Sequence, residues 1–89
     1  MDEKKIKAAA LKYNKIVDNA PKLIAKGQGN IAKEIIKRAK EHNIYIKEDS
    51  DLIEVLYALD INEEIPESLY RVIAQLLTEI YEINKKYKQ

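Results

Sequence analysis

The stretch NAPKLIAKGQGNIA, residues Asn19–Ala32, decides the fold of this chain. It contains both glycines and one of the two prolines of the protein. Pro21 biases the preceding residue towards an extended conformation, and the short apolar run Leu23–Ala25 predicts a buried central strand. Gly27 and Gly29 are predicted to form a tight structural turn. A helical pattern starts directly after them, so the stretch predicts a turn, a strand, a second turn and a helix start.

The neighbouring segments extend this pattern into a small sheet. Residues 5–13 predict a strand, and a helix capped by Asn30 is predicted to stop near Asn43. Ile44–Ile46 has two β-branched residues around a tyrosine and predicts a third strand. Strand, helix and strand in this order predict a βαβ unit with parallel strands. We therefore expect an α/β fold with a short, mainly parallel sheet of about three strands.

The second half of the chain predicts helices that cover this sheet. Ser50 is predicted to cap a short helix over Asp51–Leu59, and Pro66 to start a long C-terminal helix that runs to about Lys86. Apolar residues repeat along the last helix at a spacing that fits either a coiled-coil seam or a face packed on the sheet. The second interpretation is favoured because the small sheet needs a cover, although the turns past Ile80 are expected to project beyond the core.

The chain as a whole is predicted to form one domain. Residues 1–89 are expected to fold as a single unit in which three to four helices wrap the sheet, with residues 1–4 and 85–89 frayed. An apolar content of 46% and a charged content of 35% are typical of a globular protein and not of a disordered one.

The composition also excludes several classes of protein. The chain has no cysteine, so it has no disulfide framework and no thiolate chemistry. The N-terminus lacks the apolar region of a signal peptide, and no apolar run approaches the roughly 20 residues that span a bilayer. We therefore predict a soluble cytoplasmic protein without direct membrane insertion.

The net charge of +1 is unevenly distributed along the sequence. Residues 1–47 carry twelve lysines and arginines against five acids, whereas residues 48–82 carry ten acids against Arg71. Two faces of opposite sign could steer partners, but the simpler interpretation is that the two halves attract each other in the fold. Nucleic-acid binding is not expected, because the basic residues are not clustered with aromatics and the protein as a whole is not basic.

No pattern in the sequence indicates catalysis or metal binding. Gly27-x-Gly29-x-x-Ala32 formally matches a dinucleotide-binding pattern, but 89 residues are too few for the additional βα units of such a fold. His42 is the only histidine, so a zinc site is not expected. We predict that the protein is not an enzyme and has no metal and no cofactor.

Several short motifs in order resemble one known family. They are AALKY at 9–13, NAPKLIAKGQGNIA at 19–32, AKEHNI at 39–44, LIEVLY at 52–57 and EEIPESLYRVIAQLLTEIY at 63–81. This order resembles the cytoplasmic C-terminal region of the FlhB/YscU family, the export switch proteins of flagella and type III secretion. The resemblance covers roughly residues 8–83, which is nearly the whole chain.

The resemblance breaks down at the motif in which the family cleaves itself. Family members are cut within an Asn-Pro-Thr-His motif, and the corresponding positions in this sequence are Glu3, Lys4, Lys5 and Ile6. Self-cleavage is therefore not expected. The transmembrane region of the family has no counterpart either, so the chain looks like the fragment after cleavage, made as a stand-alone protein.

The resemblance implies a non-enzymatic binding module for protein secretion. Such a module would dock with components or substrates of the export apparatus, at the cytoplasmic face of that apparatus. The residues predicted to form its apolar contact patch are Ala20, Pro21, Tyr57, Leu69 and Tyr70.

Two alternative functions stay open. In the family, the first strand of the fragment pairs with a strand that precedes the cleavage point, so the strand over residues 5–13 is expected at an edge. That edge is either protected by lysines or recruits a strand from a partner. The first alternative is accordingly a small homodimeric adaptor that uses the last helix or this edge strand; in general, the protein is expected to be a monomer or weak dimer. The second is a nucleotide-binding fragment that uses Gly27-x-Gly29.

Overall fold

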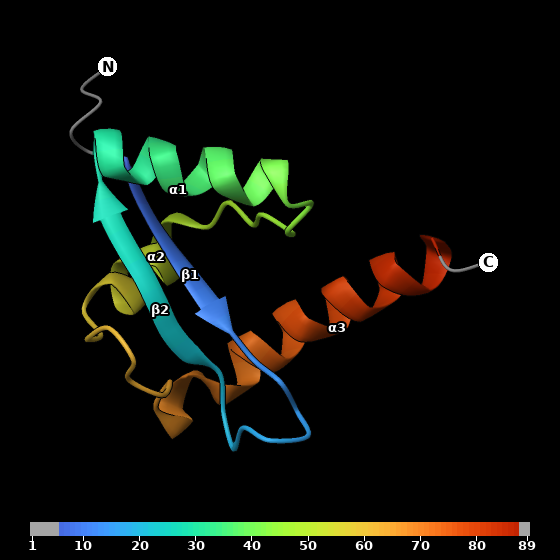
Figure 1. Ribbon diagram of the computed structural model, residues 1–89. Helices are drawn as coiled ribbons and strands as arrows, with labels where there is room; N and C mark the ends of the chain where they lie inside the picture. The colour runs from blue at the N-terminus through green and yellow to red at the C-terminus, as the bar shows by residue number, and fades with distance from the viewer. Residues whose placement is uncertain (1–5, 88–89) are drawn as a thin grey trace.

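The computed structural model describes residues 6–87, except for the side chains of Asn84, Lys86 and Tyr87. Most of the residues predicted to be frayed, 1–4 and 88–89, lie outside this range. In chain order the elements are β1 Lys7–Lys12, β2 Lys22–Gln28, α1 Asn30–Glu41, α2 Ser50–Tyr57, the 3₁₀ helix η2 Glu67–Leu69 and α3 Tyr70–Tyr87. The helix α1 lies across one face of the sheet, α2 lies behind the other face, and α3 extends away from the body towards the C-terminus (Figure 1).

The sheet is a two-stranded antiparallel hairpin. Opposite pairs run from Lys7 with Gln28 to Ala10 with Ala25, after which the register shifts and Leu11 lies opposite Leu23. Ile24 is therefore the additional residue of a bulge. An isolated bridge between Lys22 and Glu64 extends the sheet on the outer side of β2.

The predicted mainly parallel sheet of about three strands is wrong. Residues 44–49 belong to no ladder and connect α1 to α2, so the third strand over Ile44–Ile46 and the βαβ crossover do not form. Ile44 is 59% exposed, and Tyr45 is held by its hydroxyl, which donates a hydrogen bond of 2.9 Å to Glu79 of α3. The β-branched and aromatic pattern therefore reflects an extended connection that side chains anchor.

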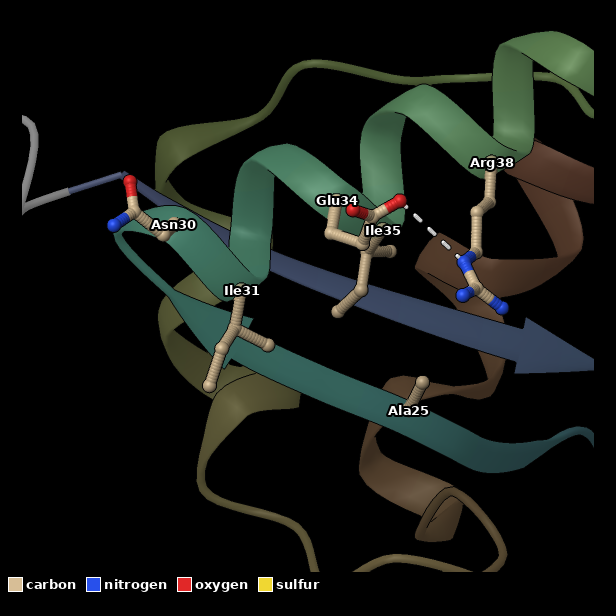
Figure 2. Close-up of a pocket in the computed structure, with 6 residues that line it drawn as sticks. All are labelled: Ala25, Asn30, Ile31, Glu34, Ile35 and Arg38. Carbon is tan, nitrogen blue, oxygen red and sulfur yellow. Dashed lines mark hydrogen bonds and ion pairs between the residues drawn. The ribbon is translucent and has the colours of Figure 1, made fainter.

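Small residues form the face of the sheet beneath α1. Ala8 and Ala10 lie opposite Gly27 and Ala25, and Ala32 of α1 is completely buried above them. A β-carbon at Gly27 would overlap the side chain of Ile31 on α1, which lies directly above β2 (Figure 2). The absence of a side chain at this position therefore lets the helix approach the strand closely.

The two glycines do not form one turn together, as was predicted, but have separate roles. Gly27 lies inside β2, which continues to Gln28, and only Gly29 turns the chain, with φ of 61°. Gly29 also occupies the N-cap position that was predicted for Asn30, and Asn30 is the first helical residue.

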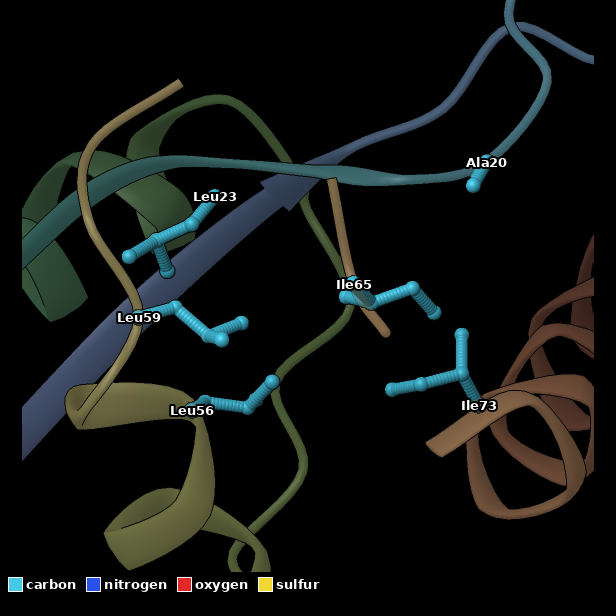
Figure 3. Packing of buried hydrophobic residues seen from close by; sticks show 6 residues of the cluster. All are labelled: Ala20, Leu23, Leu56, Leu59, Ile65 and Ile73. Atoms are coloured by element: carbon cyan, nitrogen blue, oxygen red, sulfur yellow. The ribbon is translucent and has the colours of Figure 1, made fainter. Parts of the chain in front are cut away.

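Large aliphatic residues fill the opposite face of the sheet, between β2, α2 and α3. Leu23 is completely buried and Ile73 is 2% exposed, and the two lie within one cluster (Figure 3). The buried members of this cluster are Ala20, Leu23, Leu56, Leu59, Ile65 and Ile73. Because these residues come from four separate parts of the chain, their burial fixes how α2 and α3 lie against the hairpin.

The helix ends follow local sequence signals. Asn43 has φ of 56°, and the next N–H, that of Ile44, donates to the carbonyl of Ala39 at 2.8 Å, which closes the C-terminus of α1 near the predicted stop. The cap of α2 is Asp49 and not the predicted Ser50. Its carboxylate accepts the N–H groups of Asp51 and Leu52 at 3.1 and 2.9 Å.

The long helix α3 has two different halves. Its first part packs against the core through Ile73, Leu76 and Leu77, as the sheet-covering interpretation predicts. Its later part extends beyond the body of the domain, where Tyr81 is 61% exposed (Figure 1). Over residues 6–87, no helix is both long enough and apolar enough to cross a bilayer.

Candidate protein-binding surfaces

The connection between β1 and β2 presents two apolar side chains to solvent. Ile16 is 86% exposed and Val17 is 74% exposed. Neither side chain therefore anchors the loop to the core. Exposed aliphatic side chains of this kind are candidates for contact with another protein, because their removal from water is favourable.

Hydrogen bonds hold this loop in shape without any contribution from Ile16 or Val17 side chains. The backbone N–H of Asn14 donates to the carboxylate of Asp18 at 2.8 Å, and the N–H of Asp18 donates to the carbonyl of Asn14 at 2.7 Å. The side-chain oxygen of Asn14 accepts the N–H of Ile16 at 3.0 Å. The exposure of the two apolar side chains is therefore imposed by an ordered turn.

A shallow groove of about 670 Å³ separates this loop from α3. We call it the loop–α3 groove, and it is lined by Tyr13, Asn14, Lys15, Ile16, Leu77, Thr78, Ile80 and Tyr81. Tyr13 and Tyr81 are 38% and 61% exposed, so aromatic and aliphatic surface is available on both sides. A groove of this composition can accept apolar side chains of another protein.

The structure divides the predicted contact patch. Ala20 is 2% exposed and Pro21 is buried as well, so neither can present surface to a partner, contrary to the prediction. Their burial follows from the pairing of the Pro21 carbonyl with the N–H of Ile65 at 2.9 Å and from the packing of Ala20 in the core. Leu69 is half-buried against the same core, and only Tyr70, at 45%, is clearly exposed.

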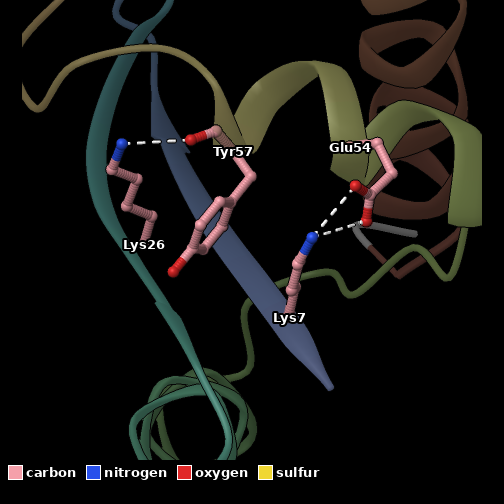
Figure 4. Close-up of polar contacts among 4 residues, drawn as sticks. All are labelled: Lys7, Lys26, Glu54 and Tyr57. Carbon is pink, nitrogen blue, oxygen red and sulfur yellow. Dashed lines mark hydrogen bonds and ion pairs between the residues drawn. The ribbon is translucent and has the colours of Figure 1, made fainter. Parts of the chain in front are cut away.

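Tyr57, the remaining residue of that patch, lies in a different place. Its ring lies near two lysines, with the Nζ atoms of Lys7 and Lys26 at 5.2 and 5.3 Å from the ring centroid (Figure 4). Lys26 also donates to the carbonyls of Tyr57 and Leu59 at 3.0 and 2.7 Å. These contacts satisfy carbonyls at the end of α2 and join that helix to β2, so Tyr57 has a structural role here.

Lys7 makes the matching connection from β1. Its Nζ lies 2.9 and 3.0 Å from the two carboxylate oxygens of Glu54 on α2 (Figure 4). Lys7 and Glu54 are 26% and 62% exposed, so the ion pair adds little stability by itself. It lies on the face of α2 that is turned towards β1.

The glycine pattern provides no phosphate cradle in this geometry. Gly27 is part of a strand, and the space that its absent side chain leaves is filled by Ile31. The nucleotide-binding alternative therefore has no support from the conformation of this segment.

The polar cluster that sequence reasoning missed connects residues 45–47 to α3. Glu79 accepts hydrogen bonds from the Tyr45 hydroxyl at 2.9 Å and from Lys47 Nζ at 3.3 Å. The hydrogen bond from Tyr45 and, to a smaller extent, that from Lys47 lower the pKa of Glu79 below its ordinary value of 4.5. The hydrogen bond between Tyr45 and Glu79 also raises the pKa of Tyr45 above its ordinary value of 10.0. No sequence pattern pairs residues 34 positions apart, so only the fold reveals this contact.

The titratable groups do not form a metal centre in the part of the chain that the structure describes. There, no group of three or more His, Cys, Asp or Glu side chains is arranged to hold a metal ion. His42 is exposed at the C-cap of α1.

Comparison with known proteins gives consistent results from sequence families and curated sequences. The family model described as "FlhB HrpN YscU SpaS Family" matches residues 7–80. The protein YlqH of Bacillus subtilis is 40% identical over 82 residues, which cover 92% of this chain and 88% of YlqH. The flagellar biosynthetic protein FlhB of Borreliella burgdorferi is 40% identical over 81 residues, which cover 90% of this chain and 22% of FlhB. The chain thus spans nearly all of YlqH but only about a fifth of FlhB.

Solved structures that share this fold include two with high coverage of the chain. The cytoplasmic domain of FlhB from Shewanella putrefaciens has a TM-score of 0.84 and 32% identity, covering 92% of this chain and 68% of that one. A mutated C-terminal domain of EscU/SpaS has a TM-score of 0.82 and 28% identity, covering 86% of this chain and 96% of that one.

Proposed function

Because the chain belongs to the FlhB HrpN YscU SpaS family, we propose that it is a non-enzymatic binding module of flagellar or type III protein export. It would dock with protein components of the export apparatus or with export substrates, on the cytoplasmic side of that apparatus. The coverage of YlqH and of the EscU/SpaS domain supports a module of this size as a recurring unit.

The observation that carries the proposal is the ordered exposure of Ile16 and Val17. Their turn is held by hydrogen bonds to Asn14 and Asp18, so the two side chains stay in solvent rather than folding back onto the core. An apolar surface maintained in this way next to the loop–α3 groove suits a protein partner. This surface replaces the contact patch predicted around Ala20 and Pro21, which are buried.

The proposal is tested by binding to purified cytoplasmic domains of the export apparatus from the same organism. We expect Ile16→Asp to weaken binding by about tenfold or more, because a charge replaces an apolar anchor at the centre of the contact. The melting temperature should not change, since Ile16 is 86% exposed. Ile44→Asp is a matched control, because Ile44 is 59% exposed on the connection between α1 and α2. Equal binding by the two variants would refute the assigned surface.

A second candidate function, the homodimeric adaptor, is favoured by the outer edge of β1. The N–H of Gly29 donates to the carbonyl of Ile6 at 2.8 Å, and this bond determines which residues of β1 form backbone hydrogen bonds with β2 and which do not. The backbone groups of Lys7, Ala9 and Leu11 then point away from β2, and within residues 6–87 no backbone hydrogen bond from another segment reaches them. An open edge of this kind can pair with a strand of a second copy.

Sedimentation equilibrium distinguishes the two candidates. A dimer that Ala9→Pro converts into monomer would support the adaptor, because proline removes an outward N–H without disturbing the bonds to β2. A monomer at high protein concentration would exclude the adaptor and leave the binding module unaffected.

A further inference from the structure

The outer edge of β2 is paired along only part of its length. The N–H of Leu23 donates to the carbonyl of Glu63 at 2.9 Å, and the N–H of Asn62 donates to the carbonyl of Leu23 at 2.6 Å. The edge is therefore already used for backbone pairing by the protein's own chain. Beyond the bulge at Ile24, this pairing stops.

Along the remainder of this edge, Lys26–Gln28, some backbone groups have no backbone partner within residues 6–87. The N–H of Gly29 donates to the carbonyl of Ile6, and in an antiparallel pair only every second residue forms backbone hydrogen bonds with the partner strand. The backbone groups of Gly27 and Ala25 therefore bond to β1. The N–H and C=O groups of Lys26 and Gln28 consequently point outwards. In the described residues, no segment apart from the hairpin itself forms a backbone hydrogen bond with either residue.

A second groove opens beside this free edge. It has a volume of about 430 Å³, and we call it the β2–α1 groove; its lining is Ala25, Asn30, Ile31, Glu34, Ile35 and Arg38. These residues come from β2 and α1 and none comes from β1, so the groove lies over the outer side of β2 (Figure 2). The aliphatic side chains of Ile31 and Ile35 project towards the strand, and Ile31 is 62% exposed.

We propose that the outer edge of β2 binds an extended segment of a partner protein as an additional strand. Its backbone would pair with Lys26 and Gln28, and an aliphatic side chain would enter the β2–α1 groove. The unpaired backbone groups specify an extended occupant, because only another extended chain satisfies donors and acceptors at alternating positions. This site is separate from the loop–α3 groove and does not depend on it.

The charges around the edge define the chemistry of the segment. Side chains of an added strand alternate between the two faces of the sheet, so one set meets the groove and the other set meets the α2 side. Lys26 projects on the α2 side, where it contacts Tyr57, so an acidic side chain on this face of an added strand would lie beside its ammonium group. The segment should therefore have aliphatic residues on one face and acidic residues on the other.

A second copy of this chain is a poorer occupant of the same edge. Two-fold pairing through Lys26 and Gln28 centres on Gly27, close to the start of α1 at Asn30. It would bring the positive ends of two helix dipoles together, which is unfavourable.

The test uses a fluorescent heptapeptide with alternating glutamate and valine, and matched peptides in which lysine replaces glutamate or serine replaces valine. We expect the glutamate–valine peptide to bind at least tenfold more tightly than either of the others, by fluorescence anisotropy. NMR-detected amide exchange should then slow at Lys26 and Gln28. Protection of Ala9 and Leu11 instead would overturn the proposal, since it would place the peptide on β1.

Substitutions at Gln28 supply a matched pair. Gln28→Pro removes the outward N–H, whereas Gln28→Thr retains it and suits a strand. We expect the proline variant to lose at least tenfold in affinity and the threonine variant to stay within twofold, with circular dichroism confirming that both fold. Equal affinities of the two variants, or a chain that sediments as a dimer with these amides protected, would refute a peptide at this edge. If Gln28→Pro does not fold, the exchange pattern of the unmodified chain decides.

Discussion

The two faces of the hairpin are closed in opposite ways. Beneath α1, the sheet presents alanines and Gly27, and the helix approaches the backbone closely. On the other face, Leu23 is covered by long aliphatic side chains from α2 and α3. One strand, β2, contributes to both faces because the additional residue of the bulge, Ile24, reverses the alternation of side chains between Ala25 and Leu23. The stability of the protein should therefore be sensitive to added volume on the α1 face and to lost volume on the other face.

The largest effect is expected from Leu23→Ala on the side of the long aliphatic residues. Leu23 is completely buried, so its truncation should lower the free energy of unfolding by about 3 kcal/mol through lost burial and a residual cavity. Urea denaturation measures this change. Ile24→Ala is the control, because Ile24 is the neighbouring bulge residue and is 45% exposed. Similar losses in the two variants would contradict the assignment of the faces.

Gly27→Val tests the α1 face by adding volume. The new β-carbon would overlap Ile31, and we expect a loss of about 2 kcal/mol from the displaced helix. The double variant with Ile31→Ala should recover part of this loss, because the smaller side chain leaves room for valine. A double-mutant cycle by urea denaturation gives the coupling between the two positions. Additive losses would mean that the two side chains do not compete for space.

Asp49→Ala tests how α2 is held over the aliphatic face. Its carboxylate accepts two backbone N–H groups at the start of α2, and the substitution should lower the free energy of unfolding by about 1 kcal/mol. Ser50→Ala is the matched control, since Asp49 rather than Ser50 supplies the cap. The prediction fails if the serine variant is the more destabilised of the two in thermal denaturation.

The smallest effect concerns the contact of Glu79 with Tyr45 and Lys47, which joins the 45–47 segment to α3. Because the pKa of Glu79 is lowered in the folded state, its contribution to stability is present above pH 4.5 and is lost as the pH falls through the lowered pKa. Glu79→Gln should therefore be slightly less stable than the unmodified chain at pH 7, and the difference should shrink in acid. Thermal denaturation between pH 7 and pH 3 measures it, and a difference that does not depend on pH would argue against the ion-pair contribution.

The sequence alone determined which segments form helices and at which residues the family resemblance begins and ends. Periodic apolar residues predicted all three α-helices within a few residues, and the family motifs over roughly 8–83 agree with the family match over 7–80. These features are local, so neighbouring residues contain enough information to specify them. Pro66 was predicted to start the last helix, but it is extended, with ψ of 159°, and precedes the 3₁₀ helix η2, so α3 begins only at Tyr70.

The tertiary structure decided the sheet and the exposed surfaces. The segment Leu23–Ala25 lies in β2, which pairs with β1 and not with Ile44–Ile46, because the residues of a strand do not specify which other segment it pairs with. The burial of Ala20 and Pro21 and the exposure of Ile16 and Val17 depend on where residues 62–65 and α3 lie. A short apolar run has the same sequence whether the fold covers it or not. Burial is a property of the assembled chain, and for this reason the candidate binding surfaces emerged only from the three-dimensional arrangement.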